Sequence, residues 1–205
     1  MVGIVNYGMG NLKSVFNAIE YIGGSALICE KASDLDKVTK IIIPGVGAFG
    51  KCITNLQESG FTDKLNDLVL HKGIPTLGIC VGMQIMATNG YEGGEWKGLN
   101  WFNADVIKID SQQNTLRIPN IGWTEIDLQQ EHFLFSKISQ KPVVYFVHSY
   151  FMKCRETKDI LATYNYGEAI TACVLKNNII ATQFHPEKSQ DTGLQFLTNY
   201  LNWNP

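Results

Sequence analysis

Short apolar runs alternate with amphipathic stretches along the first half of the chain. Residues 2–7, 26–29 and 40–43 are mostly hydrophobic, which is typical of parallel strands that are covered on both faces. Asn11 stands at a helix N-cap position before apolar residues spaced three and four apart, and a glycine pair at 23–24 ends that pattern. The alternation of strand and helix predicts the α/β class, with a parallel sheet at its centre.

The second half of the chain carries a different pattern. Polar and apolar residues alternate within 99–127, around a turn-rich stretch at 111–115, which predicts antiparallel strands appended to the sheet. Residues 143–147 form an apolar run that predicts a buried strand. Further strands are expected at 160–166, 169–175 and 179–184. The predicted fold is an open, mostly parallel sheet with flanking helices and appended antiparallel strands.

Composition narrows the class of protein. The 205 residues are 45% hydrophobic and 18% charged, which suits one globular domain over residues 1–205. A net charge of -2 gives no basic field for nucleic acid or for an anionic membrane surface, so neither partner is expected. The five cysteines lack C-x-x-C spacing, and neither an export signal nor an apolar run of about 18 residues is present. We therefore expect a cytoplasmic protein without a disulfide framework or a zinc site.

A thiol at a tight turn is the first candidate for chemistry. Residues 75–84 predict a buried strand that turns sharply into a helix, with Cys80 at the corner. Gly78 and Gly82 stand two positions to either side, where such a turn brings the backbone into contact. The amides and the positive dipole end of the helix would favour a thiolate. Considered alone, the pattern suits a buried structural cysteine equally well.

A glycine-dense loop follows the third predicted strand at residues 44–50. In a parallel sheet this loop and the Cys80 turn both lie at the carboxyl ends of strands, where open α/β sheets bind ligands. Its backbone amides and the N–H of Val81 could stabilise an oxyanion, although a plain strand-to-helix turn would look the same. A glycine turn at 8–10 with Glu30 further on half-matches a dinucleotide-binding fingerprint, but Lys13 occupies the third glycine position.

His185 and Glu187 are the candidate partners of the thiol. They follow the last predicted strand, and in an extended chain residues two apart face the same side. A cysteine that attacks an amide needs an imidazole to move its proton and a carboxylate to orient that imidazole. His148, at another strand end, is the alternative base, whereas His71 and His132 look like surface residues. The thiol, the glycine loop and this pair, all at strand ends of one sheet, predict an amide-hydrolysing site.

The motifs that carry these residues resemble those of the class I, or triad, glutamine amidotransferases. The resemblance rests on Gly-Ile-Cys-Val-Gly-Met-Gln at 78–84 and His-Pro-Glu at 185–187, and it extends over essentially the whole chain. It implies a three-layer, flavodoxin-like fold. By this resemblance Cys80 forms a glutamyl thioester, His185 acts as acid and base, and Glu187 orients the imidazole.

The same resemblance implies where a substrate would bind. It places Gly47 and Val81 near the oxyanion, and it implies neither a cofactor nor a metal ion. Four side chains fall where the family holds the α-amino and α-carboxyl groups of glutamine: Gln84, Glu92, Ser149 and Tyr150.

Within the family, further motifs are similar to those of the glutaminase subunits of imidazole glycerol phosphate synthase. They occupy residues 7–12, 44–49, 122–123, 145–150 and 185–189. This similarity implies that ammonia from L-glutamine passes to a separate (β/α)8 barrel cyclase subunit in a heterodimer. Trp123 and Lys188 are the candidates for that contact, because a large aromatic side chain and a cation beside the site suit an interface. The alternative is that Trp123 fills a local cluster and Lys188 is solvated.

Three positions depart from the family pattern and leave the ammonia acceptor open. Val81 stands where leucine is usual, and Asn120 and Thr124 replace a histidine and an asparagine around Gly-Trp. We expect the last two positions to bear on the partner interface, so a specialised copy that serves amidino-sugar synthesis for surface polysaccharide is an alternative. A non-catalytic binding module and a cysteine peptidase are the other classes considered. The intact set of Cys80, His185 and Glu187 argues against the first. A pocket with Glu92 and Gln84, suited to the charged ends of a free amino acid, argues against the second.

Overall fold

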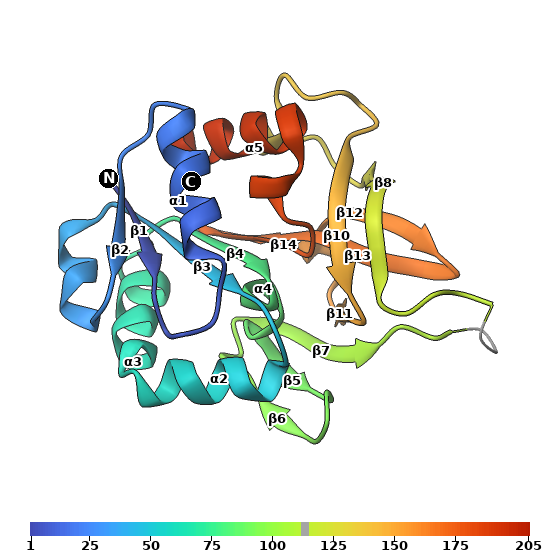
Figure 1. Cartoon of the computed structure of the whole chain (residues 1–205), viewed down its shortest axis with the longest axis horizontal. Coiled ribbons are helices and arrows are strands. Elements are labelled where there is room, and N and C mark those ends of the chain that lie inside the picture. The colour runs from blue at the N-terminus through green and yellow to red at the C-terminus, as the bar shows by residue number, and fades with distance from the viewer. Residues whose placement is uncertain (112–114) are drawn as a thin grey trace.

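The computed structural model describes residues 1–111 and 115–205. A central sheet runs through the middle of the molecule (Figure 1). In spatial order its strands are β2 (Ala26–Cys29), β1 (Val2–Val5), β3 (Lys40–Gly45), β4 (Thr76–Cys80), β14 (Ile179–Thr182), β13 (Glu168–Lys176), β12 (Ile160–Tyr166) and β9 (Asp127–Leu128). The segments predicted as strands in the first half of the chain and within 160–184 all lie in this sheet, so the α/β architecture is confirmed.

The direction of the strands divides the central sheet into two parts. β2, β1, β3, β4 and β14 pair in parallel, and β13, β12 and β9 continue the sheet antiparallel. β3 and β4 are buried at every position, as strands covered on both faces must be. Their last residues, Gly45 and Cys80, are register partners. The glycine loop and the Cys80 turn therefore leave the same edge of the sheet side by side.

Helices cover both faces of the sheet and give three layers. α1 (Leu12–Tyr21) and α5 (Gln190–Asn202) lie on one face, and α2 (Phe49–Glu58) and α3 (Phe61–Asn66) lie on the other (Figure 1). The predicted cap of α1 is present, because the Asn11 side chain accepts a hydrogen bond from the backbone N–H of Ser14. Shorter helical segments are the one-turn α4 (Val81–Gln84), a π-helical turn at Asp67–His71, and 3₁₀ segments at Ala32–Lys37, Phe133–Phe135, Thr157–Asp159 and Pro186–Lys188.

Two smaller sheets lie beside the central one. The first contains β11 (Tyr150–Cys154), β7 (Phe102–Lys108), β5 (Ala87–Gly90) and β6 (Trp96–Lys97). The second is a two-stranded ribbon of β8 (Asn120–Glu125) and β10 (Val143–His148), called the β8–β10 ribbon below. Of the turn predicted at 111–115, residues 112–114 lie outside the described part.

The smaller sheets correct two predictions. β7 and β8, within 99–127, do not join the central sheet, and β10 is not fully buried, since Val143 is 46% exposed. An alternating pattern shows that one face of a strand is covered, but pairing is long-range, and the pattern does not say which strand lies alongside.

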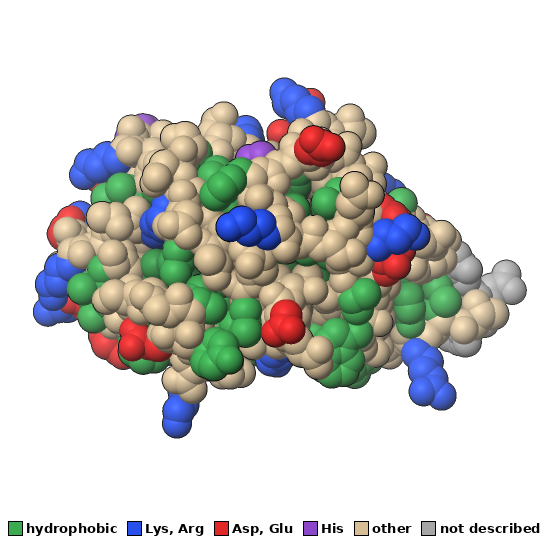
Figure 2. Space-filling model, turned by 90° about the horizontal axis from the view of Figure 1, so that it is seen from above, with side chains coloured by type: hydrophobic (Ala, Val, Ile, Leu, Met, Phe, Trp, Pro, Cys, Tyr) green, Lys and Arg blue, Asp and Glu red, His purple; other side chains and the backbone are tan. Residues whose placement is uncertain are grey.

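Charged side chains of both signs are visible on one face of the molecule (Figure 2). Figure 2 shows basic and acidic side chains interspersed on the face that it presents. The five cysteines are all free thiols. Within residues 1–111 and 115–205, no helix combines the length and apolarity that a membrane crossing needs.

Candidate active site

Cys80 ends β4 at a sharp corner of the backbone. Its φ of 55° and ψ of -112° lie outside the regions that non-glycine residues usually adopt, which is typical of strained functional turns. The two flanking glycines are required by close contact. A Cβ atom on Gly78 would lie 3.0 Å from the carbonyl oxygen of Gly82, and one on Gly82 would overlap the carbonyl oxygen of Ile43. The predicted strand-to-helix elbow is therefore present.

The helix after the elbow is shorter than expected. α4 spans only Val81–Gln84, and the chain enters β5 three residues later. Because a macrodipole is the sum of aligned peptide units over several turns, one turn supplies little of the predicted electrostatic help to the thiol. Charge near Cys80 must come chiefly from side chains.

His185 and Glu187 form a buried pair, but not on an extended strand. β14 ends at Thr182, and Pro186–Lys188 is a 3₁₀ segment with Pro186 at its first position. The Nδ1 atom of His185 lies 2.8 Å from Oε1 of Glu187, and the side chains are 2% and 1% exposed. The predicted pairing is present, although the turn that produces it differs from the strand geometry expected.

The charge state of His185 is set by its neighbours. Burial lowers the pKa of its imidazole, but interactions with Cys80 and Glu187 outweigh burial and raise it from 6.5 to about 10. Within the described residues, the buried Nε2 of His185 and Oε2 of Glu187 make no hydrogen bond. Nδ1 is committed to Glu187, so Nε2 is the ring atom available to a reacting group.

His148 does not have the properties of a base. Its Nδ1 lies 2.8 Å from the carbonyl oxygen of Tyr150, and its Nε2 lies 2.8 Å from the hydroxyl of Tyr164. Burial lowers the pKa of His148 to about 4, and the nearby charge of His185 acts in the same direction. Both ring nitrogens are occupied, so the alternative in which His148 takes the thiol proton is not supported. His71 is exposed as expected, whereas His132 is half-buried.

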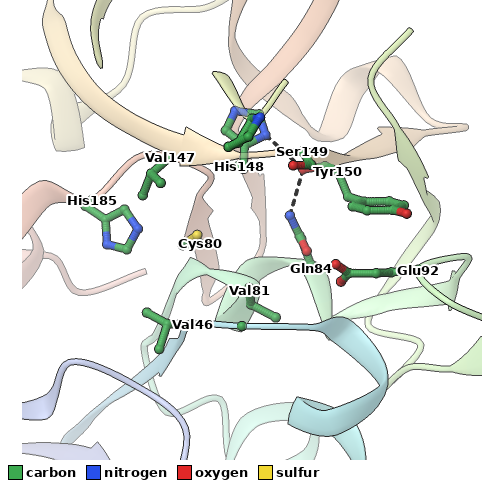
Figure 3. Close-up of a pocket in the computed structure, with 12 residues that line it drawn as sticks. Val46, Cys80, Val81, Gln84, Glu92, Val147, His148, Ser149, Tyr150 and His185 are labelled. Carbon is green, nitrogen blue, oxygen red and sulfur yellow. Dashed lines mark hydrogen bonds between the residues drawn. The ribbon is translucent and has the colours of Figure 1, made fainter. Parts of the chain in front are cut away.

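One cavity of about 350 Å³ gathers the predicted site residues (Figure 3). The predicted residues in its lining are Gly47, Cys80, Val81, Gln84, Glu92, Ser149, Tyr150 and His185. Glu187 lies behind His185, outside the lining. Val46, Pro119, Val147 and His148 complete the wall and were not assigned to a substrate site from the sequence.

Gln84 and Glu92 present oxygen atoms on one side of this cavity (Figure 3). The Nε2 of Gln84 donates to the carbonyl oxygen of Tyr150 at 2.8 Å and to Oε1 of Gln183 at 3.0 Å. Its own Oε1 is therefore the atom left for a ligand. Glu92 accepts a hydrogen bond from the backbone N–H of Phe49 through Oε2 at 2.7 Å, which fixes the carboxylate at the start of α2. An amino group is the kind of ligand that two such oxygens suit.

The glycine loop lines the cavity through Val46 and Gly47 and is exposed. Val46, Gly47 and Ala48 are all solvent-exposed, and Gly47 has a φ of 96°, which favours glycine. Two backbone carbonyls of the loop, those of Pro44 and Val46, accept hydrogen bonds from buried side chains. The hydroxyl of Tyr7 donates to the carbonyl oxygen of Pro44 at 2.7 Å, and the thiol of Cys52 lies 3.5 Å from the carbonyl oxygen of Val46. The loop is thus held at its carbonyls while its tip faces solvent.

The predicted contact residues flank the cavity on the β8–β10 ribbon and just beyond the His185 turn. Trp123 is 55% exposed and packs edge-on against Tyr145, with ring centroids 4.9 Å apart. The Nζ atom of Lys188 lies 5.8 Å from the centroid of the same Tyr145 ring. Trp123, Tyr145 and Lys188 therefore form a local cluster, from which Trp123 stays largely exposed.

Sequence reasoning missed Gln183, which is fully buried next to the thiol. Its Nε2 donates to Sγ of Cys80 at 3.7 Å, and its Oε1 accepts from Gln84. A polar residue inside an apolar strand end, two positions before His185, was the available signal.

Comparison with known proteins agrees with this geometry. Residues 4–202 match the family described as glutamine amidotransferase class-I. The imidazole glycerol phosphate synthase subunit HisH of Leptospira interrogans is 42% identical over 204 residues, covering 98% of this chain and 100% of the relative. The subunit named HisH 1 of Campylobacter jejuni strain RM1221 is 41% identical over 201 residues, covering 98% and 99%.

A solved structure described as a glutamine amidotransferase shares the fold. It matches with a TM-score of 0.74 at 19% identity, covering 97% of this chain and 98% of the other. The sequence relatives and the fold together show that this chain belongs to the class-I glutamine amidotransferase family and, within it, to the HisH subunits of imidazole glycerol phosphate synthase.

Proposed function

We propose that this chain hydrolyses L-glutamine to glutamate and ammonia through a thioester on Cys80, as the glutaminase subunit of imidazole glycerol phosphate synthase in histidine biosynthesis. The observation that carries the proposal is the strained Cys80 corner in one cavity with His185, whose imidazole is paired to Glu187. A buried thiol, an imidazole and a carboxylate in this order are the parts that acyl transfer from an amide requires.

The first half-reaction releases ammonia. With a pKa of about 10, His185 is an imidazolium at neutral pH, so the proton that the thiol would give up already resides on the ring. The Cys80 sulfur attacks the carboxamide carbon of glutamine, and the carbonyl oxygen becomes an oxyanion that the N–H groups of Gly47 and Val81 would stabilise. Nε2 of His185 then gives its proton to the amide nitrogen. The C–N bond breaks, ammonia leaves, and the glutamyl group remains as a thioester.

The second half-reaction uses one water molecule. His185, now neutral, takes a proton from the water, and the oxygen attacks the thioester carbonyl. The C–S bond breaks, glutamate leaves, and the proton on His185 restores the starting pair. Glu187 keeps the ring oriented throughout. Gln84 and Glu92 are proposed to bind the α-amino group of the substrate, and Ser149 and Tyr150 its α-carboxylate.

The ammonia is proposed to pass directly to a (β/α)8 cyclase subunit in a heterodimer, in the cytoplasm. Ammonia that reaches bulk water becomes ammonium, which is a poor nucleophile. The exposed apolar face of the β8–β10 ribbon, with Ile121 60% and Trp123 55% exposed, adjoins the cavity through Val147 and is the proposed docking surface. Lys188 extends this surface past the His185 turn.

The two departures on β8 do not lie on that surface. Asn120 is buried, where its Nδ2 donates to the hydroxyl of Tyr164 at 2.9 Å, and Thr124 is half-buried. Successive residues of a strand face opposite sides, so both positions lie on the inner face while Ile121 and Trp123 point outward. On this proposal both positions lie beneath the docking surface rather than in the contact, and they do not discriminate between the two ammonia acceptors.

The decisive test of the chemistry is Cys80→Ala in the purified protein with the cyclase subunit and its acceptor present. We expect glutamate release to fall by about 10⁴-fold or more, because the covalent nucleophile is lost. Cys173→Ala is the matched control, since Cys173 is an equally buried thiol in β13. A glutamine-analogue electrophile should label Cys80 and spare the other four thiols. Glutamine turnover that persists in Cys80→Ala would rule out the proposal.

The docking surface is tested by Trp123→Ala. A central aromatic anchor typically contributes 2 kcal/mol or more, so the dissociation constant of the cyclase should rise by about 30-fold. Tyr21→Ala, at a 79% exposed aromatic on α1, is the control and should leave binding unchanged. Unchanged binding by Trp123→Ala, or full glutaminase activity in the lone subunit, would contradict the coupled arrangement. Binding to an enzyme of sugar modification in place of the cyclase would identify the alternative acceptor.

A further inference from the structure

A buried chain of hydrogen bonds ends on the sulfur of Cys80. Gln183, the residue after β14, donates from Nε2 to Sγ of Cys80 at 3.7 Å. Its Oε1 accepts from Nε2 of Gln84 at 3.0 Å, and the same Gln84 nitrogen donates to the carbonyl oxygen of Tyr150 at 2.8 Å. Gln183 and Gln84 are at most 2% exposed, so water does not compete for these bonds.

The series of hydrogen bonds continues to the inner face of the β8–β10 ribbon, and the donor and acceptor of each bond can be assigned. The carbonyl of Tyr150 can only accept, so Nδ1 of His148, 2.8 Å away, carries the hydrogen. His148 is neutral, because burial lowers its pKa to about 4, and its Nε2 therefore accepts from the hydroxyl of Tyr164 at 2.8 Å. That hydroxyl in turn accepts from Nδ2 of Asn120 at 2.9 Å.

This arrangement fixes which atom of Gln183 faces the sulfur. Turning the Gln84 carboxamide over would place its oxygen against the carbonyl oxygen of Tyr150, two acceptors facing each other. Turning the Gln183 carboxamide over would place two donor nitrogens face to face. Either change leaves buried polar groups unpaired, which typically costs several times the strength of one hydrogen bond. An N–H group of Gln183 is therefore held against Cys80.

We propose that Gln183 is a positioning residue for the nucleophile: its N–H group orients the sulfur of Cys80 and favours the thiolate over the thiol. The physical reason is that a donor binds an anionic sulfur more strongly than a neutral one. The proposal rests on the proposed role of Cys80 as nucleophile. It adds a second source of thiolate stabilisation beside the His185 imidazolium, where the one-turn helix α4 supplies little.

The effect of Gln183 must be separated from that of the titratable groups near the thiol. These are His185 and Glu187 after β14, Tyr7 after β1, Cys52 on α2, Glu92 after β5 and His148 on β10. Gln183 carries no charge, so replacing it leaves all of these groups in place. A change in the pH response of Cys80 then reports on the lost N–H group.

The test is the rate at which iodoacetamide alkylates Cys80 across a range of pH, followed by peptide mapping in the full-length chain. Gln183→Met keeps the length of the side chain and removes its donor. We expect the profile to move to higher pH and the rate at pH 7 to fall by about tenfold, the size of one charge-assisted hydrogen bond. Should Gln183→Met fail to fold, Gln183→Asn, which withdraws the amide by one methylene, should move the profile the same way.

Thr182→Val is the matched control. Thr182 is equally buried and its hydroxyl donates to the carbonyl oxygen of Phe184 at 2.9 Å, away from Cys80. This variant should lose stability without moving the alkylation profile. A wild-type profile in folded Gln183→Met, or an equal shift in Thr182→Val, would overturn the positioning role. Failure of this proposal can be distinguished from failure of the proposed function. Glutamine turnover that survives in Cys80→Ala would refute the glutaminase chemistry, whereas the alkylation profile of Gln183→Met would stay as measured.

Discussion

The two walls of the cavity differ in how firmly their reactive groups are held. On one wall Cys80 is 3% exposed and the His185 and Glu187 side chains are 2% and 1% exposed, joined by a 2.8 Å hydrogen bond. On the other wall the loop tip from Val46 to Ala48 is open to solvent. The comparison teaches that the fold fixes the proposed nucleophile, its acid and one proposed oxyanion donor, the N–H of the buried Val81. The other proposed donor, the N–H of Gly47, lies on a segment that a partner can reach. We therefore infer that a docking subunit controls catalysis through the loop.

The largest effect is expected on the buried wall, from His185→Asn. This change removes the only proposed acid and base, so the glutaminase rate should fall by about 10⁴-fold or more, nearly as much as in Cys80→Ala. Glu187→Gln keeps an imidazole that can still take a proton. The loss of glutaminase rate in this variant should be about 100-fold smaller than in His185→Asn, as for the third member of a triad. Steady-state rates with saturating glutamine compare the two. If His148→Asn abolished glutaminase activity and His185→Asn left it unchanged, the base would have been misassigned.

An intermediate effect is expected on the exposed wall, from Gly47→Ala. The φ of 96° is unfavourable for alanine, which strains the loop, and the added Cβ would lie 3.0 Å from the Cε atom of the flexible Met9 side chain. Glutaminase kcat should fall by about 10- to 100-fold, as when an oxyanion donor is misplaced. The alkylation rate of Cys80 should stay at the wild-type value, because the buried wall is untouched. Gly60→Ala, at another positive φ with open space around it, is the control for backbone strain. A parallel fall in alkylation would mean that the two walls are not independent.

The smallest expected effect is on stability. The pKa of His185 is raised from 6.5 to about 10 in the folded protein, so the fold favours its protonated form. Its contribution to the free energy of unfolding is therefore fully present below pH 6.5 and is lost as the pH rises through about 10. Urea unfolding should show the wild type losing stability over this window relative to His185→Asn. Equal pH dependence in the two proteins would show that the pair does not hold the proton.

The accuracy of the sequence predictions also differs between the two regions of the chain. Local signals predicted the Asn11 cap, the glycines around Cys80 and the strands of the parallel sheet, because each leaves a pattern within a short stretch of sequence. This holds even where the contact behind the pattern is distant, as between Gly82 and Ile43. The same reasoning placed His185 and Glu187 together on one extended strand. The pair forms instead because the extended His185 directly precedes a 3₁₀ segment that carries Glu187. It could not place β8 and β10 in a separate ribbon, nor find Gln183, because strand pairing and buried polar contacts join residues that are far apart in the sequence, as Val147 and Ile121 or Gln183 and Cys80 are.

The account is tested most directly by measuring two rates on the same samples, with and without the purified cyclase subunit and its acceptor. One is the rate of glutamine hydrolysis, and the other is the rate of alkylation of Cys80 by iodoacetamide at neutral pH. If the buried wall is fixed and the partner adjusts only the loop, the rate of hydrolysis should rise by about 100-fold or more on binding, because completing an oxyanion hole has an effect of that size. The rate of alkylation should change by less than about threefold. A proportional rise in both rates would contradict the account, because it would show that the partner acts on Cys80 and His185 themselves.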